Sequence, residues 1–321
     1  MRIFVAGATG VVGRHLVPLL VGAGHEVTGT SRTPHGLGRV RALGAAAVRA
    51  DAFDADGLRD AVAAAAPDVV IHQLTALAEG NTAENARMRR EGTRNLVDAA
   101  RRAGAGRIIA QSVAWAYAPG DSPADESTPL DLTAPLPRAN LIGGIRVLEE
   151  TAAELGEYVI LRYGTFYGAG TWYFPGGLVD QQLRQGGGTA AVSGPLTADD
   201  AVSSFLHVED AARAAAAALD WPGGAVNIVD DEPAPARDWL PVLADVFGAP
   251  IPPAAAGRAG WQRGASNALA RTRGWRPLHP SWRTGFAAMK TTDPRPEPAD
   301  APAHSAPNQP VSRDSRGNPL N

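Results

Sequence analysis

Short apolar runs alternate with longer stretches of helical periodicity through the first third of the chain. The apolar runs, rich in β-branched residues, predict strands at residues 2–6, 26–30, 46–49, 68–72 and 107–110. Apolar residues at helical spacing predict helices at residues 12–23, 55–66 and 85–103. The strands show little polar alternation, which is typical of strands buried on both faces. The pattern therefore predicts an α/β protein with a doubly wound parallel sheet.

The rhythm loosens after residue 111, and a proline-rich loop follows at 118–138. Further helices are predicted at 141–155, 208–219 and 236–247, and further strands at 158–162 and 225–229. Between them, glycine, proline and aromatic residues gather at 163–204, as in long loops that cover a ligand.

These patterns divide the chain into three regions. We expect an α/β core at residues 1–162 and a smaller C-terminal substrate-binding region at 163–290, with strands and helices that return to the core. Residues 291–321 are rich in Pro, Ala, Ser, Asp and Arg and hold almost no large apolar side chain. Such a composition cannot bury a core, so we predict a disordered tail there.

Composition narrows the classes of partner. The 321 residues are 45% hydrophobic with a net charge of −3, which suits a globular protein and gives no basic surface for nucleic acid. Glycines and Arg14 interrupt the N-terminal apolar run too early for a signal peptide or a membrane span. Cysteine is absent and the acidic pairs at 199–200 and 230–231 lack histidine at ligand spacing, so we expect no metal site. The resulting expectation is a cytoplasmic protein that acts on a small molecule.

Three glycines spaced three residues apart, Gly7, Gly10 and Gly13, follow the first strand and open the first helix. Glycine lets the backbone turn tightly and approach a pyrophosphate, and the helix N-terminus offers free N–H groups and the positive end of its dipole. In this context the spacing predicts a dinucleotide-binding loop, to which Thr9 and Val11 also belong.

The second strand ends in Ser31 and Arg32, with no carboxylate to accept hydrogen bonds from a free ribose 2′-hydroxyl. Arg32, helped by Ser31 and Arg14, is suited to a 2′-phosphate, so we favour NADP(H) over NAD(H). The alternative is that these arginines are ordinary solvated side chains.

Residues after the third and fourth strands complete the expected cofactor site. Asp51 and Ala52 follow the third strand, where adenine is contacted in such folds, and Leu74 and Thr75 follow the fourth. For Asp51, a surface or helix-capping role is the alternative.

Four ordered segments resemble the extended short-chain dehydrogenase/reductases, the NAD-dependent epimerase/dehydratase family, over residues 1–288. They are the Gly-x-x-Gly-x-x-Gly loop at 7–13, the segment at 162–168, the helix start at 205–212 and the strand at 226–228. The resemblance implies a Rossmann fold with a nicotinamide cofactor and places Tyr163, Thr165 and Phe166 beside that cofactor. It also allows a homodimer through the helices at 85–103 and 141–155.

The acid–base chemistry of that family depends on a helical Tyr-x-x-x-Lys motif, and this chain departs from it. The matching helix carries Leu141 and Ile145 at the two positions, and the sole lysine, Lys290, borders the predicted tail. The family's proton relay is therefore expected not to operate.

Hydroxyl groups near the sheet edge are the remaining catalytic candidates. By resemblance, Ser112 matches a frequent serine and Val113 the position of the catalytic hydroxyl, so a shift of one residue decides whether Ser112 acts. Tyr117 and Tyr167 match tyrosines that many relatives keep for packing, and packing or proton transfer are both open.

Aromatic side chains are the candidates for substrate contact. If Trp115, Trp172, Tyr173 and Phe174 converge with Val113, they form an apolar pocket for a flat or hydrophobic small molecule. Packing in the core or in a lid is the alternative. We expect His72 and His207 to be structural.

These features predict an atypical NADP(H)-dependent oxidoreductase for a small apolar or aromatic carbonyl or hydroxyl compound. A strongly electrophilic substrate would tolerate the missing acid, because hydride transfer depends mainly on orientation. A non-redox cyclase, dehydratase or isomerase on the same fold, and a nucleotide-sensing regulatory protein, are the alternatives.

Overall fold

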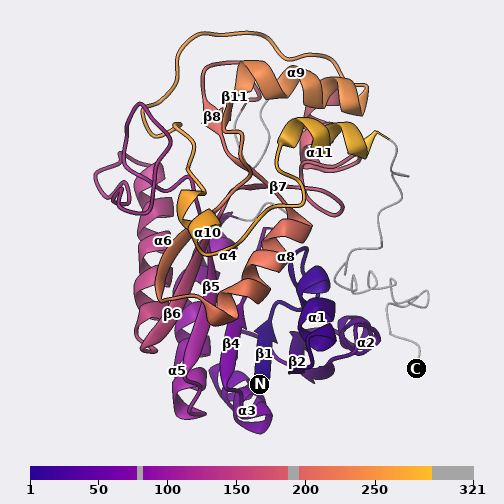
Figure 1. Cartoon of the computed structure of the whole chain (residues 1–321), viewed down its shortest axis with the longest axis vertical. Coiled ribbons are helices and arrows are strands. Elements are labelled where there is room, and N and C mark those ends of the chain that lie inside the picture. Colours follow the sequence, from indigo (N-terminus) through magenta and orange to yellow (C-terminus); the bar gives the residue numbers. More distant parts are fainter. Residues whose placement is uncertain (78–81, 187–194, 291–321) are drawn as a thin grey trace, which may run out of the picture.

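A computed structural model describes residues 1–77, 82–186 and 195–290. At its centre lies a parallel sheet of seven strands in the order β10-β6-β5-β4-β1-β2-β3 (Figure 1). The strands are β1 (Arg2–Ala6), β2 (Glu26–Ser31), β3 (Ala46–Arg49), β4 (Val69–His72), β5 (Arg107–Val113), β6 (Glu157–Tyr163) and β10 (Gly224–Ile228). The strand order reverses between β1 and β4, which is the switch point of a doubly wound Rossmann sheet. The predicted fold class is confirmed.

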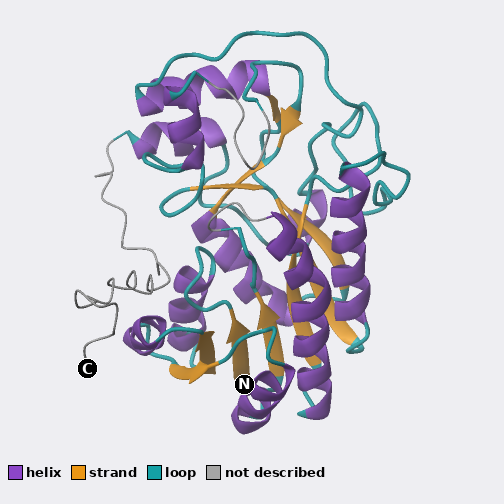
Figure 2. Ribbon diagram, turned by 180° about the vertical axis from the view of Figure 1, so that it is seen from behind, coloured by secondary structure: helices purple, strands orange, loops and turns teal. Residues whose placement is uncertain are grey.

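Helices cover both faces of this sheet (Figures 1 and 2). One face carries α1 (Gly13–Gly22) and α8 (Val208–Ala217), which pack against each other. The other carries α3 (Ala55–Ala65), α5 (Thr93–Arg102) and α6 (Arg138–Ala153). Beside the sheet edge lies α2 (Pro34–Ala42), which was not predicted.

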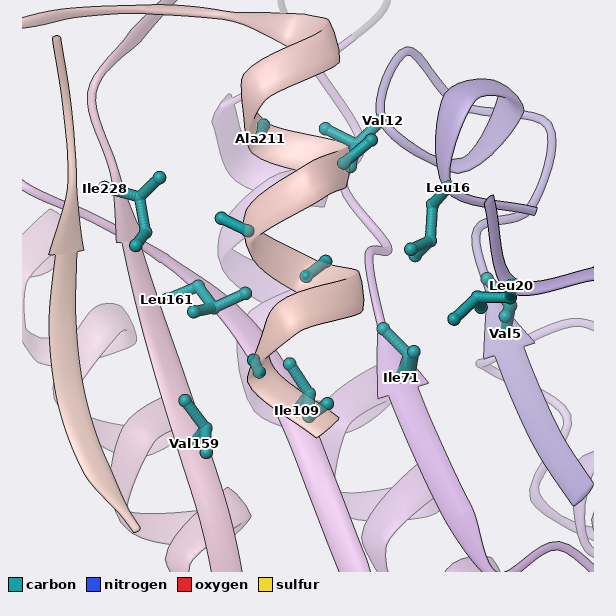
Figure 3. Packing of buried hydrophobic residues seen from close by; sticks show 14 of the residues in the cluster. Val5, Val12, Leu16, Leu20, Ile71, Ile109, Val159, Leu161, Ala211 and Ile228 are labelled. Carbon is teal, nitrogen blue, oxygen red and sulfur yellow. The ribbon is translucent and has the colours of Figure 1, made fainter. Parts of the chain in front are cut away.

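The core follows from the alternation of side chains along each strand. In β1, Ile3 and Val5 join the cluster under α1 and α8, whereas Phe4 joins the cluster under α3 and α5. Figure 3 shows Ile71 and Leu161 beside α8 and Val5 beside Leu20 of α1, on the same face of the sheet. Both faces of every central strand are thus buried, which explains the continuous apolar runs in the sequence.

A second hydrophobic cluster lies beyond one end of the sheet and is built from the C-terminal half of the chain (Figure 1). Its helices are α7 (Leu178–Arg184), α9 (Ala236–Phe247) and α11 (Trp282–Met289), with the short α10 (Ala268–Thr272) nearer the sheet. Short strand pairs connect it to the core: β7 (Thr165–Tyr167) with β9 (Phe205–His207), and β8 (Val202–Ser203) with β11 (Ala234–Pro235). Phe205 lies at its centre, against the rings of Trp239 and Phe286.

The helix predicted at 85–103 is interrupted. It consists of α4 (Thr82–Arg87), a π-helical turn η1 (Met88–Gly92) and α5, which follow one another directly. A short 3₁₀ turn, η2 (Ala218–Asp220), likewise ends the helix that begins at α8. The tail predicted at 291–321 lies outside the described residues. None of the described helices has the length and apolar character needed to cross a bilayer.

Candidate functional site

The glycine loop lies between β1 and α1, at the carboxyl edge of the sheet. Gly7 has φ of 94°, and a Cβ there would lie 2.7 Å from the carbonyl oxygen of Gln73. A Cβ on Gly13 would collide with the backbone of Gly7 and Ala8. Only glycine therefore allows the loop to pack against β4 and against its own helix.

The outer side of this loop fits a pyrophosphate. A Cβ on exposed Gly10 would meet only the carbonyl oxygen of Gly7, so the backbone is open to close approach. The N–H groups of Val11, Val12 and Gly13 have no acceptor among the described residues. These groups open α1, where the helix dipole favours an anion. The loop thus has the geometry required to hold the phosphates of a dinucleotide.

Residues after β2 line the same edge. Ser31 is buried, and its Oγ accepts a hydrogen bond from the Thr33 N–H at 3.3 Å. Arg32 is exposed and has no hydrogen-bond or ion-pair partner in the described segments. Arg14 is engaged elsewhere, because its guanidinium donates to the carbonyl oxygen of Ala169 in the C-terminal region. The help predicted from Arg14 for a 2′-phosphate stays a prediction.

The ends of β3 and β4 supply backbone and small side chains to this edge. Asp51 accepts from the Phe53 N–H at 2.9 Å, which is a local turn, and buried Ala52 accepts from Asn95 at 2.8 Å. Leu74 is half-buried and Thr75 is exposed after β4. Their predicted contacts with the cofactor stay predictions.

Two glutamines link the carboxyl ends of strands by hydrogen bonds, and neither was predicted from the sequence. Gln73 Nε2 donates to the Tyr163 hydroxyl at 3.2 Å, and Gln111 Nε2 donates to the carbonyl oxygen of Leu74 at 2.9 Å. The Tyr163 ring lies 5.2 Å from that of Phe166, and Thr165 is half-buried beside it. In the sequence, a polar residue at the end of an apolar strand could have indicated these hydrogen bonds.

The helix that would carry the family's acid–base pair is apolar on the relevant side. Ile145 is 1% exposed and packs with Ile142, Val113 and Trp115. Leu141, one turn earlier on α6, is half-buried. Lys290 pairs with Asp245 at 2.6 Å in the C-terminal cluster. No lysine therefore replaces the missing one.

Ser112 and Tyr117 belong to a buried polar network. Ser112 Oγ donates to Glu149 at 2.6 Å, and Glu149 is bound twice by Arg162, at 2.6 and 2.9 Å. Arg162 also donates to the Tyr117 hydroxyl at 3.0 Å, which in turn donates to Asn227 at 2.5 Å. Burial raises the pKa of Tyr117 to about 12. These partners favour a structural role for both residues, and proton transfer by either stays an untested prediction.

Tyr167 is fully buried in the C-terminal cluster, between His207 and Phe286. Its hydroxyl has no hydrogen-bond partner among the described residues, and Gly285 leaves the space that it fills. Burial raises the pKa of this phenol well above its ordinary value. This environment favours packing over acid catalysis.

The aromatic candidates for substrate contact divide between two clusters. Trp115 packs with Val113 against α6, and the Arg138 guanidinium lies 5.9 Å from its ring. Trp172, Tyr173 and Phe174 pack instead against α9 and β9 in the C-terminal cluster. The structure does not gather these side chains into one apolar cluster.

His72 and His207 have structural partners, as expected. His207 Nδ1 accepts from the Glu209 N–H at 3.3 Å and caps α8. His207, Asp210 and His279 come close enough to hold a metal, but Asp210 accepts from the backbone N–H groups of Leu278 and His279 at 2.6 and 2.9 Å. Those hydrogen bonds give the cluster a structural explanation, and we propose no metal site there.

One buried arginine without a partner among the described residues was not anticipated. Arg89, in the π-turn η1, is 8% exposed and packs against Gly144 of α6. It lies four residues before Thr93 and seven before Leu96, which are both fully buried. This helical spacing places Arg89 on the same face as the buried residues, so the sequence could have indicated a buried arginine.

Comparison with known proteins agrees with this geometry. The sequence model of the NAD dependent epimerase/dehydratase family matches residues 3–228. A 3-diazoavenalumate denitrifying reductase from a Streptomyces species is 44% identical, over 89% of this chain and 99% of that protein. A 2-alkyl-3-oxoalkanoate reductase from Stenotrophomonas maltophilia is 29% identical, over 78% of this chain and 77% of that protein.

Solved structures show the same fold. The UDP-glucose 4-epimerase of Thermus thermophilus in complex with NAD superposes with a TM-score of 0.68 at 23% identity, covering 91% of this chain and 100% of that one. The family match spans most of the chain and includes the glycine loop. The resemblance inferred from four sequence segments is confirmed: the chain belongs to the NAD-dependent epimerase/dehydratase family and is an enzyme of the NAD(P)-dependent oxidoreductase type.

Proposed function

We propose that this enzyme reduces an aromatic acid that carries a diazonium group, replaces that group with hydrogen and releases dinitrogen. The observation that carries the proposal is the apolar face of α6, where Leu141 and Ile145 stand at the positions of the family's proton donor and its lysine. A reaction that needs no proton suits such a site.

The balance of this reaction explains why the acid is dispensable. When bound, a nicotinamide nucleotide would supply a hydride, and the electron pair of that hydride would form the new bond to the ring carbon. The carbon–nitrogen bond of the diazonium group breaks, and its electron pair leaves with dinitrogen. No proton is taken up or released in this sum. Carbonyl reduction, by contrast, develops an alkoxide that must gain a proton.

The chain's own residues would bind and orient the reactants. The glycine loop and the N-terminus of α1 would hold the phosphates, and Tyr163 is fixed by Gln73 at the edge where the nicotinamide half would lie. Val113 and Trp115, packed against α6, offer an apolar wall that excludes water. Substrate orientation then supplies the rate acceleration.

The relative that is 44% identical supports this substrate class. Its name describes a reductase that removes nitrogen from a diazo compound, and the ending of the substrate name denotes the anion of an acid. That name also favours net reduction over the non-redox and sensing alternatives. The carbonyl substrate expected from the sequence keeps support from the oxoalkanoate reductase at 29% identity.

The cofactor form belongs to the same proposal. We favour NADP(H), because Arg32 is exposed and unpaired in the described segments at the end of β2 and no carboxylate follows that strand. Ser31, whose hydroxyl proton is free to donate, is the second candidate for the 2′-phosphate.

A parallel assay separates the two substrate classes. Purified enzyme with NADPH is given the diazonium salt of 3-aminocinnamic acid or, separately, a 3-oxo acid of similar size. We expect dinitrogen release and cinnamic acid above the rate without protein, and no reduction of the oxo acid. Reduction of the oxo acid alone would contradict the proposal.

A further inference from the structure

The π-turn η1 holds a guanidinium in an unusual setting. Arg89 is 8% exposed, and it has no hydrogen-bond or ion-pair partner in the described part of the chain. Burial lowers its pKa to about 10. Burying most of a guanidinium without a counter-ion is costly, and its nitrogens are not among the fully enclosed unpartnered atoms, so the charged end of Arg89 stays accessible. Turns of this kind are frequent at functional sites.

The other buried arginines of the described structure are paired. Arg138 lies 2.8 Å from Asp131, and Arg162 lies 2.6 Å from Glu149. Exposed Arg87, in the preceding helix α4, also has a carboxylate partner, Glu91, at 2.6 Å. Arg89 alone among the three buried arginines lacks such a partner.

Hydrogen bonds fix η1 at the carboxyl edge of the sheet. The Leu74 N–H donates to Nδ1 of His72, so Nε2 of this neutral ring donates to Thr93 Oγ1, at 2.9 Å. Thr93 donates in turn to the carbonyl oxygen of Met88 at 3.4 Å. The turn that carries Arg89 is therefore attached to the end of β4, next to the strand-order reversal where ligands bind in such sheets.

Helix α6 makes room for the arginine. A Cβ on Gly144 would lie 3.7 Å from Arg89 Cδ, so the arginine stem packs where this helix has no side chain. Gly144 lies between Leu141 and Ile145, the positions that the family uses for its acid–base pair. The stem of Arg89 thus packs against the turn of α6 that carries those two positions.

We infer that Arg89 binds an oxyanion of the bound small molecule, and specifically the carboxylate of an aromatic acid substrate. The inference rests on the proposed function for the identity of that acid. A guanidinium pairs with a carboxylate through two parallel hydrogen bonds, and burial strengthens the pair. Arg89 is a substrate-binding residue that makes the enzyme selective for acids over neutral compounds.

Binding measurements test this role without turnover. Calorimetric titration of the NADPH-saturated enzyme uses cinnamate as the acid and cinnamamide as its neutral counterpart. In Arg89→Met we expect the Kd of cinnamate to rise by at least about tenfold, while cinnamamide changes by less than about twofold. In Arg89→Lys the Kd of cinnamate should lie between those of the wild type and Arg89→Met, because lysine keeps the positive charge but cannot form two parallel hydrogen bonds with the carboxylate. The exposed neighbour provides the control, Arg90→Met, which should bind both compounds normally.

Stability distinguishes binding from a structural role. Removal of an unpaired buried charge should raise the melting temperature of the ligand-free enzyme in Arg89→Met, whereas loss of a structural contact would lower it. Unchanged cinnamate binding in both Arg89 variants would overturn the inference. Weakened NADPH binding with unchanged cinnamate binding would also overturn it and assign Arg89 to a cofactor phosphate.

The outcome for Arg89 is independent of the outcome for the reaction. An enzyme that binds cinnamate through Arg89 but reduces no diazonium acid would contradict the proposed reaction and support this site. An enzyme that reduces diazonium acids, but whose Arg89 variants bind cinnamate as the wild type does, would support the proposed reaction and contradict the role of Arg89.

Discussion

Single residues at the carboxyl edge show what local sequence can and cannot indicate. Gly7 and Gly13 were identified from spacing alone, because the constraint on each is local backbone geometry. Ser112 and Tyr117 were considered catalytic because their partners were invisible. Glu149 and Asn227, which bind them, lie 37 and 110 residues away. Long-range hydrogen bonds decide the role of a hydroxyl, and one sequence does not reveal them.

The preference for NADP(H) depends on one exposed arginine. In Arg32→Gln we expect the Kd of NADPH to rise by about tenfold or more, because a charge-assisted contact with the 2′-phosphate is lost. The Kd of NADH should change by less than about twofold. Fluorescence titration of both nucleotides measures this, with Arg41→Gln in the exposed last turn of α2 as the control. Equal effects on the two nucleotides would argue against the assignment.

Buried His72 makes stability depend on pH. Burial lowers its pKa from 6.5 to about 4, so the folded state binds this proton more weakly than the unfolded chain does. Its contribution is fully present above pH 6.5 and is lost as the pH falls toward 4, by about 3 kcal/mol in total.

Urea unfolding of the wild type and of His72→Leu across this pH range measures the effect. The variant loses two hydrogen bonds and is less stable at pH 7, but its acid-dependent loss should be smaller than that of the wild type. The exposed residue His35 supplies the control, since His35→Gln should keep the full acid dependence. Identical pH curves for all three proteins would refute the role of His72.

Secondary elements were predicted where periodicity is strong. The seven strands of the main sheet were all expected, and β5 extends three residues further, to Val113. Elements α7, α10 and α11 were missed because they are short and lie among glycines and prolines. The π-turn η1 was missed because one extra residue per turn leaves almost no trace in the apolar pattern. This turn positions the only buried arginine without a partner in the described structure.

Two glycines of α1 provide a matched test of the nucleotide loop. Gly13→Ala places a methyl group against the backbone of Gly7, so we expect a loss of about 1–3 kcal/mol in unfolding free energy. Nucleotide affinity should fall by at least about tenfold, because the loop must shift. Gly22→Ala, where a Cβ meets nothing within 4 Å, should instead add about 0.5–1 kcal/mol and leave affinity unchanged. Equal nucleotide binding by both variants would contradict the account of the loop.

At the scale of the whole molecule, a Rossmann fold shared with the family carries Leu141 and Ile145 where the resemblance places the acid–base pair. Family membership and the doubly wound parallel sheet were predicted from patterns spread over the chain, whereas the strand order comes from the structure. The arrangement of the aromatic residues did not follow, because Trp115 and Trp172 pack into different clusters. A homodimer through the helices at 85–103 and 141–155 stays a prediction, and the outer faces of α5 and α6 carry ion pairs such as Arg94 with Glu154.

The central claim is that the enzyme delivers a hydride without a protein proton donor. A single turnover with NADPH that carries deuterium at the transferred position, in ordinary water, tests it by mass spectrometry of the product acid. We predict one deuterium on the ring carbon that carried the diazo group, and no ring deuterium when unlabelled NADPH is used in heavy water. Ring hydrogen that comes from the solvent would contradict the account.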